Sequence, residues 1–185
     1  MHGKLDDAYG TGLVVESGDW GSRILTAEHV IEGGRNLRAR VGDARQNLSV
    51  RIIARDKDQD LALLETTAAK NVPVPRLGDS HDVVPGDEIG LLGYPIPDAF
   101  ADEGLGRTAS IYIGHVASIR DAGTPNAAIE LDLPIVPGES GGPVFMPDGR
   151  VVGIAESRFD EEHAIGFATP MEVIEPFLRA HPRAK

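Results

Sequence analysis

The sequence predicts an all-β protein that ends in one short helix. Its 22 glycines and 13 prolines are spread along 185 residues, a distribution typical of many short strands joined by tight turns. The apolar content of 41% is that of an ordinary globular protein. The length fits one domain, or two small halves that share a core. Many short strands with a terminal helix fit two packed antiparallel β-barrels.

Short apolar runs bounded by turn residues mark the expected strands. In chain order they are residues 9–16, 23–26, 37–41, 48–54, 61–64, 89–93, 108–119, 128–131, 144–146, 151–155 and 164–168. Prolines and glycines interrupt the pattern at 95–107 and predict a loop there. We therefore expect one domain over 1–185, with an N-terminal barrel half at 9–94, a linking loop at 95–107 and a C-terminal barrel half at 108–169.

The last expected element is a helix at 170–180. Thr169 can cap it, Pro170 suits the first helical position, and Glu172 completes a capping box. Ile174 and Phe177 lie on the face that would be turned toward the core.

Composition excludes some function classes and leaves the compartment open. The net charge of −11 disfavours nucleic-acid binding, because contact with phosphates needs an excess of Lys and Arg. No run of about 18 apolar residues occurs, so no membrane span is expected. The first residues carry no apolar signal segment. The localisation stays unknown: a cytoplasmic protein and a domain cut from an exported protein both fit.

The segment 137–144 has the composition that a nucleophilic serine needs. Ser140 is bracketed by Gly138 on one side and by Gly141 and Gly142 on the other. Glycines let the backbone turn sharply and let a substrate carbonyl come close. Successive backbone N–H groups can then point at one spot and stabilise an oxyanion.

Two upstream segments supply the base and the acid that such a serine requires. His29 lies in the run Thr-Ala-Glu-His-Val, and Asp60 directly precedes the apolar run Leu-Ala-Leu-Leu. Asp56 and Asp58 are close by, but Asp60 is favoured by its place immediately before the strand. The order His29, Asp60, Ser140 is that of the chymotrypsin template and differs from the subtilisin and α/β-hydrolase orders.

From about Gly10 to Leu178 the sequence resembles the trypsin-like (chymotrypsin-fold) serine proteases. Within that family it is most similar to the HtrA/Deg protease domain, which has similar segments at Asp132, at 92–95 and at 165–170. The absence of cysteine differs from the disulfide-rich animal trypsins and is similar to bacterial or archaeal proteases. The HtrA/Deg group usually carries a PDZ domain, whereas this sequence stops after the helix, so the resemblance implies a protease domain without one.

The resemblance implies a serine endopeptidase that works through an acyl-enzyme and needs no metal or cofactor. Ser140 would attack the peptide carbonyl, His29 would take and return the proton, and Asp60 would orient the imidazole. The N–H groups of Gly138 and Ser140 would form the oxyanion hole. Glu139 departs from the family, which has aspartate or asparagine before the serine. We expect no zymogen cleavage, so any activation would come from ordering of loops.

The primary specificity pocket is expected to be modest and apolar. By resemblance, it is lined by Ile135, Gly153, Ile154, Ala155, Arg158, Gly166, Phe167 and Ala168. No carboxylate is expected at its base, so small or medium aliphatic P1 residues are favoured over Arg and Lys. Arg158 and His163 leave a preference for acidic residues open.

The expected partners are protein or peptide substrates, with a regulatory domain or partner protein as a further possibility. Two alternatives to a free-standing protease remain at this point. The chain could be a protease-fold module that binds peptides and rarely cuts them. It could also be the protease part of a larger regulated protein.

Overall fold

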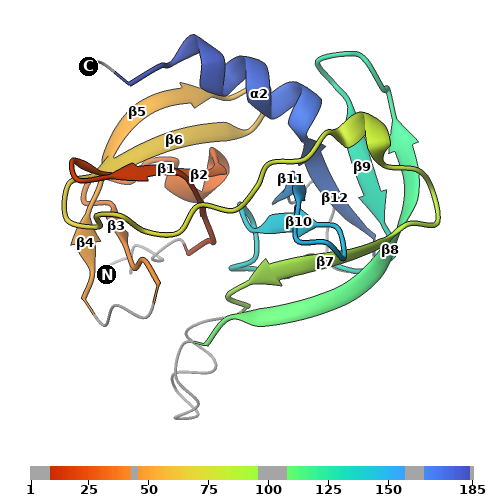
Figure 1. Cartoon of the computed structure of the whole chain (residues 1–185), viewed down its shortest axis with the longest axis horizontal. Helices are drawn as coiled ribbons and strands as arrows, with labels where there is room; N and C mark the ends of the chain where they lie inside the picture. Colours follow the sequence, from red (N-terminus) through yellow and green to blue (C-terminus); the bar gives the residue numbers. More distant parts are fainter. Residues whose placement is uncertain (1–8, 43–45, 96–107, 157–164, 184–185) are drawn as a thin grey trace, which may run out of the picture.

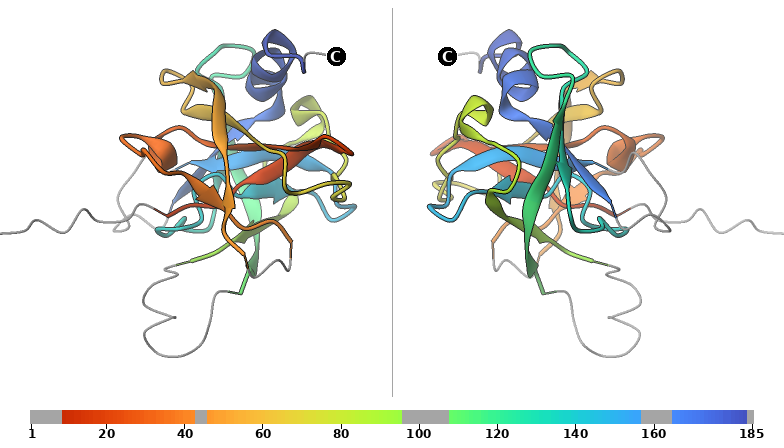
Figure 2. Two further views of the ribbon diagram at one scale, coloured as in Figure 1. Left: turned by 90° about the vertical axis from the view of Figure 1, so that its left-hand side faces the viewer. Right: turned by 90° about the vertical axis from the view of Figure 1, so that its right-hand side faces the viewer.

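Two groups of strands lie side by side, and the C-terminal helix crosses above both (Figure 1). The structure is a computed structural model that describes residues 9–42, 46–95, 108–156 and 165–183. Side views from both directions again show α2 (Met171–Ala180) at one end of the molecule, with the strands beneath it (Figure 2). No helix in these ranges is long and apolar enough to cross a membrane.

The N-terminal group is built around a four-stranded antiparallel sheet. Its order is β1 (Leu13–Gly18), β2 (Gly21–Ala27), β6 (Leu61–Thr66), β5 (Arg51–Asp56). A two-stranded ribbon of β3 (Arg38–Ala39) and β4 (Leu48–Ser49) completes the group, and the short 3-10 turn η1 (His29–Ile31) follows β2. Every residue of β6 is buried, because both faces of this strand are covered.

The C-terminal group is a closed six-stranded barrel. Its strands are β7 (Glu88–Gly93), β8 (Ser110–Arg120), β9 (Ala128–Leu131), β10 (Pro143–Phe145), β11 (Val151–Glu156) and β12 (Gly166–Pro170). They pair in the order β10-β11-β12-β9-β8-β7, and all the pairs are antiparallel. The all-β class with a short C-terminal helix is confirmed.

One boundary expected from the sequence is wrong. β7 was assigned with the N-terminal half, which was expected to end at residue 94, yet it pairs with β8 and β10 in the closed barrel. The chain crosses between the halves earlier, at 67–87, a stretch that includes the turn η2 (Ser80–Asp82) and runs across the front of Figure 1. A bridge between Leu77 and Val151 fixes this crossing against the barrel. An alternating apolar strand has the same pattern in either half, so the local sequence did not identify its partners.

A shared apolar cluster joins the two halves. It contains Leu25, Leu61 and Leu63 from the N-terminal sheet, Ile154 from β11, and Met171, Ile174 and Phe177 from α2. The alternate residues of β6, Ala62 and Leu64, belong to a second cluster inside the N-terminal half. A third cluster fills the closed barrel. The helix therefore covers the contact between the halves, and its apolar face is turned toward the core as the sequence predicted.

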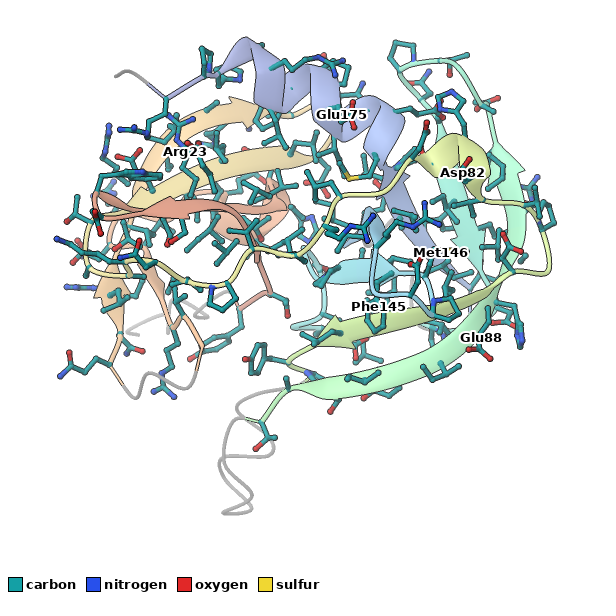
Figure 3. The ribbon with its side chains drawn as sticks, in the orientation of Figure 1. Arg23, Asp82, Glu88, Phe145, Met146 and Glu175 are labelled. Atoms are coloured by element: carbon teal, nitrogen blue, oxygen red, sulfur yellow. The ribbon has the colours of Figure 1, made fainter. Side chains whose placement is uncertain are left out.

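The N-terminus of the helix does not have the expected capping box. Pro170 occupies the N-cap position, and no side chain caps the helix there. Thr169 belongs to β12, and its hydroxyl donates to Glu156 at 3.2 Å. The N–H of Glu172 donates instead to the Ser80 hydroxyl of η2 at 3.1 Å. At the other end, the buried Arg23 of β2 donates to the carbonyl of His181 at 2.8 Å, beneath the end of the helix (Figure 3).

Candidate active site

His29 and Asp60 form a doubly hydrogen-bonded pair. The Nδ1 atom of His29 lies 2.7 Å from Oδ2 of Asp60, and the backbone N–H of His29 donates to Oδ1 at 2.8 Å. Asp60 lies in the turn between β5 and β6 with φ at 51°, a left-handed conformation that aspartate tolerates better than most residues. With Nδ1 donating to Asp60, the neutral imidazole has its acceptor at Nε2, the nitrogen that a general base uses.

The surroundings of His29 favour its protonated form. Its pKa is raised above the ordinary value of 6.5, first by the hydrogen bond to Asp60; partial burial opposes this shift. The negative charges of Asp60, Glu28 and Glu156 raise it further. Glu28 is buried and is held by Arg55, whose Nε donates to it at 2.8 Å. The site can therefore stabilise the imidazolium that a proton transfer from serine would create.

Ser140 lies on a buried loop whose backbone is fixed from two sides. Thr11 donates from its N–H to the carbonyl of Ser140 at 2.9 Å and from its hydroxyl to the carbonyl of Gly138 at 2.7 Å. The N–H of Gly141 donates to the carbonyl of Ala155 on β11 at 2.8 Å. Gly138 and Gly141 have φ values of 97° and 83°. Residues that carry a side chain rarely adopt this left-handed backbone conformation. The expected role of these glycines in turning the chain is borne out at both positions.

The Ser140 loop packs directly against the segment that leads to His29. A Cβ atom at Gly141 would lie 2.3 Å from the Thr26 hydroxyl and 2.9 Å from the N atom of Ala27. A Cβ at Gly10 would touch both Val30 and the carbonyl of Ser140. The barrel therefore brings its serine loop to the turn that holds the imidazole. Among the hydrogen bonds of the described residues, none joins the Ser140 hydroxyl to His29.

Two backbone donors of the loop are free to bind an incoming group. Glu139 donates its N–H to Val136, Gly141 to Ala155, and Gly142 to Glu139. In the described part of the chain, the N–H groups of Gly138 and Ser140 donate to no other atom. These are the two donors that the sequence singled out for an oxyanion.

The expected pocket residues are gathered in the C-terminal barrel, and most of them are tightly packed. Ile135, Ala155 and Ala168 belong to the barrel cluster, whereas Ile154 points to the cluster between the halves. Phe167 is half-buried on β12, where it pairs with Glu156. A Cβ at Gly166 would lie 3.0 Å from Ile135, and one at Gly153 would lie 2.7 Å from the carbonyl of Thr169. Arg158 and His163 lie outside the described residues.

Sequence reasoning missed Thr11 and Glu156. Thr11 connects the loop to Tyr94, whose N–H donates to the Thr11 hydroxyl at 3.1 Å. In the sequence, Thr11 is marked only by its place between two glycines. Glu156 is 3% exposed, and its negative charge raises the pKa of His29; in the sequence, it is marked only by its place at the end of an apolar strand. Among the described residues, no group of three His, Asp or Glu side chains could hold a metal ion.

Comparison with known proteins gives a consistent result. The family model of the trypsin-like peptidase domain matches residues 10–154. The chain is 28% identical over 176 residues to the serine protease Do-like HtrA of Bacillus subtilis (strain 168), covering 90% of this chain and 38% of that protein. It is 30% identical over 180 residues to a probable periplasmic serine endoprotease DegP-like of Halomonas elongata, covering 93% of this chain and 35% of that protein.

A solved structure described as the HtrA-type protease AlgW with decapeptide superimposes with a TM-score of 0.77 at 25% identity, covering 92% of this chain and 50% of that one. The chain thus spans about half of this solved chain and a little over a third of the two curated relatives. Because the family model extends over well more than half of the sequence, the chain belongs to the family of trypsin-like peptidase domains.

Proposed function

We propose that this domain is a serine endopeptidase that cleaves peptide bonds through an acyl-enzyme. The observation that carries the proposal is the hydrogen-bonded pair of His29 and Asp60, next to a buried loop that presents Ser140 and two free backbone donors. The HtrA and DegP-like relatives are serine proteases by name. Their named activity supports the same reaction class here.

The three side chains would work in sequence. His29 takes the proton of the Ser140 hydroxyl as that oxygen attacks the substrate carbonyl, and the resulting imidazolium is stabilised by Asp60. The N–H groups of Gly138 and Ser140 bind the oxyanion of the tetrahedral intermediate; removing one such donor typically costs about 3 kcal/mol. His29 then returns the proton to the leaving amine, and water hydrolyses the acyl-enzyme by the same steps.

We propose further that the enzyme favours small or medium aliphatic P1 residues in peptide substrates. The walls formed by Ile135, Ala155 and Ala168 are apolar and packed into the barrel, which favours an aliphatic P1 side chain over a charged one. The AlgW structures contain peptides by title, which supports peptide substrates here. A P1 library would show Val, Ala or Leu ahead of Arg; Glu ahead of Val would contradict the aliphatic preference.

Labelling with a fluorophosphonate probe tests the core of the proposal. The probe reacts with an activated serine, so the wild-type chain should be labelled and Ser140→Ala should not. Ser110→Ala is a matched control, because Ser110 is a serine of β8 in the same barrel and its loss should leave labelling unchanged. A wild-type chain that resists the probe at every pH would contradict an assembled protease and favour the peptide-binding module.

A further inference from the structure

Glu139, directly before Ser140, is a carboxyl group buried inside the serine loop. It is 1% exposed. Its Oε2 atom accepts from the N–H of Val136 at 2.9 Å, while its own N–H donates to the carbonyl of Val136 at 3.1 Å. Its carbonyl accepts from the N–H of Gly142 at 2.8 Å. Side chain and backbone of this one residue thus close the turn that carries both proposed oxyanion donors.

The side chain is enclosed by the barrel, and no cation of the described residues lies beside it. A Cβ at Gly93 of β7 would lie 2.9 to 3.0 Å from three carbon atoms of Glu139, so the strand backbone packs against it. Tyr112 of β8 is the titratable group that faces it among the described residues, and within those residues Glu139 forms no ion pair. Its Oε1 atom is buried without a hydrogen-bond partner.

Such an environment penalises the charged form of a carboxyl group. Burial raises the pKa of Glu139 above its ordinary value, and the donors of Val136 and Tyr112 near the carboxyl group lower it by less. Within the described part of the chain, a carboxylate here would have one oxygen with no donor and no compensating charge. Water could reach that oxygen only if the turn opened, and opening would displace the N–H groups of Gly138 and Ser140.

We propose that Glu139 is a positioning residue that holds the Ser140 loop in its reactive shape while its carboxyl group is neutral, and that loss of the proton to solvent releases the loop. This inference rests on the proposed peptidase mechanism. It places two opposite pH requirements on one site: His29 must be neutral to act as a base, and Glu139 must be neutral to brace the loop. As pH rises through the pKa of the Glu139 carboxyl group, the wild-type enzyme therefore loses activity for a reason unrelated to His29.

The test compares the fluorophosphonate labelling rate of the wild type and Glu139→Gln over about pH 5.5 to about pH 9. Glutamine keeps the size and the acceptor for Val136, but it cannot ionise. The rate of the glutamine variant relative to wild type should rise with pH by at least about tenfold, since one oxyanion donor alone is typically worth about 100-fold or more in rate. A ratio that does not change with pH overturns the proposal.

The control substitution is Glu88→Gln. Glu88 is an exposed carboxylate on β7 of the same barrel and lies at the outer edge of the molecule (Figure 3). Its glutamine variant should keep the pH profile of the wild type. If Glu88→Gln flattened the profile as Glu139→Gln does, the effect would not belong to the loop, and the proposal would be overturned.

Hydrogen exchange of the wild-type protein tests the same idea without catalysis or mutation. After correction for intrinsic exchange, the amides of 136–142 should be protected at acid pH and lose protection as pH rises, whereas the amides of β11 should not. Constant protection of 136–142 at all pH values overturns the proposal. Because this measurement uses only the wild-type protein, it remains decisive even if Glu139→Gln does not fold. If the probe never labels the wild type but the amides of 136–142 still lose protection as pH rises, the peptidase mechanism is wrong and the positioning role of Glu139 is supported.

Discussion

At the scale of single residues, Asp60 determines which nitrogen of His29 can act. It accepts from both the backbone N–H and Nδ1 of His29, so it sets the position of the turn and the tautomer of the ring together. Its left-handed backbone conformation points the carboxylate back at η1, a local geometry that places acid and base within one hydrogen bond. Changes at this residue should therefore affect chemistry more than folding.

Asp60→Asn is expected to lower kcat by about ten-thousand-fold, as in other enzymes of this mechanism. The amide can donate to Nδ1 and so favour the wrong tautomer, which takes the acceptor away from Nε2. Steady-state kinetics on a peptide substrate checks the loss. Asp58→Asn is the control, because Asp58 lies two residues away on an exposed part of the same turn; a similar loss in that variant would place the triad acid elsewhere.

The raised pKa of His29 predicts the acid limb of the activity profile. Only neutral His29 can accept the serine proton, so activity should rise with pH, with a midpoint above 6.5. Proton NMR of the His29 ring should give the same midpoint, and Asp60→Asn should move it down because the largest cause of the shift is removed.

The same pair also makes the free energy of unfolding depend on pH. The stability contributed by the His29–Asp60 pair is present below pH 6.5 and is lost as pH rises through the pKa of His29 in the folded protein. A midpoint below 6.5 would contradict the pairing seen here.

At the scale of elements, the segment before β1 acts as a clamp on the serine loop. The Thr11 hydroxyl donates to Gly138 and accepts from the N–H of Tyr94, and the carbonyl of Thr11 accepts from Thr26 at 2.6 Å. This residue is 4% exposed. The hydroxyl of this one residue thus connects the loop to the end of β7, and its carbonyl connects them, through Thr26, to the strand that leads to His29.

Thr11→Val should damage both stability and catalysis. Valine keeps the shape but leaves the Tyr94 N–H and the Gly138 carbonyl without their partner, which typically costs about 1 to 3 kcal/mol. Denaturant unfolding measures the stability, and fluorophosphonate labelling measures the loop. Thr11→Ser retains the hydroxyl and should behave nearly as wild type; a loss in Thr11→Ser as large as that in Thr11→Val would mean that the hydrogen bonds of the hydroxyl are not what stabilises the loop.

The elements and the motifs were largely predictable from the sequence, but their partners were not. The apolar runs at 61–64 and 151–155 lie within β6 and β11, because burial leaves a local pattern. The half to which β7 belongs, and the role of Ser80 at the start of α2, depend on residues far away in the chain. The same limit applies to the site. Local motifs pointed to Ser140 and its glycines, whereas the clamp at Thr11 and the burial of Glu139 arise only from packing.

At the scale of the whole molecule, the site lies between two halves that share one apolar cluster, although each half also has a cluster of its own. The cluster shared by β2, β6, β11 and α2 means that neither half can lose its structure without exposing apolar surface of the other. The C-terminal end adds a polar connection, in which Arg23 holds the carbonyl of His181 and Arg183 lies over the ring of Trp20 at 4.8 Å. The relative position of His29 and Ser140 therefore depends on α2, although α2 carries none of the proposed catalytic groups.

Ile174→Ala tests this dependence. Ile174 is fully buried in the shared cluster, and replacing such a residue by alanine typically costs about 2 to 5 kcal/mol. Because the cluster is common to both halves, the whole domain should unfold in one transition at lower denaturant. The fluorescence of Trp20, the one tryptophan of the chain, reports on the N-terminal half, and far-UV circular dichroism reports on all elements; coincident curves indicate a single cooperative unit.

Glu175→Ala is the neighbouring control: its ion pair with Arg179 is largely exposed, so its loss should cost no more than about 0.5 kcal/mol. If Ile174→Ala instead separated the two signals into two transitions, the halves would be independent units, and the helix would not be what holds the imidazole against the serine loop.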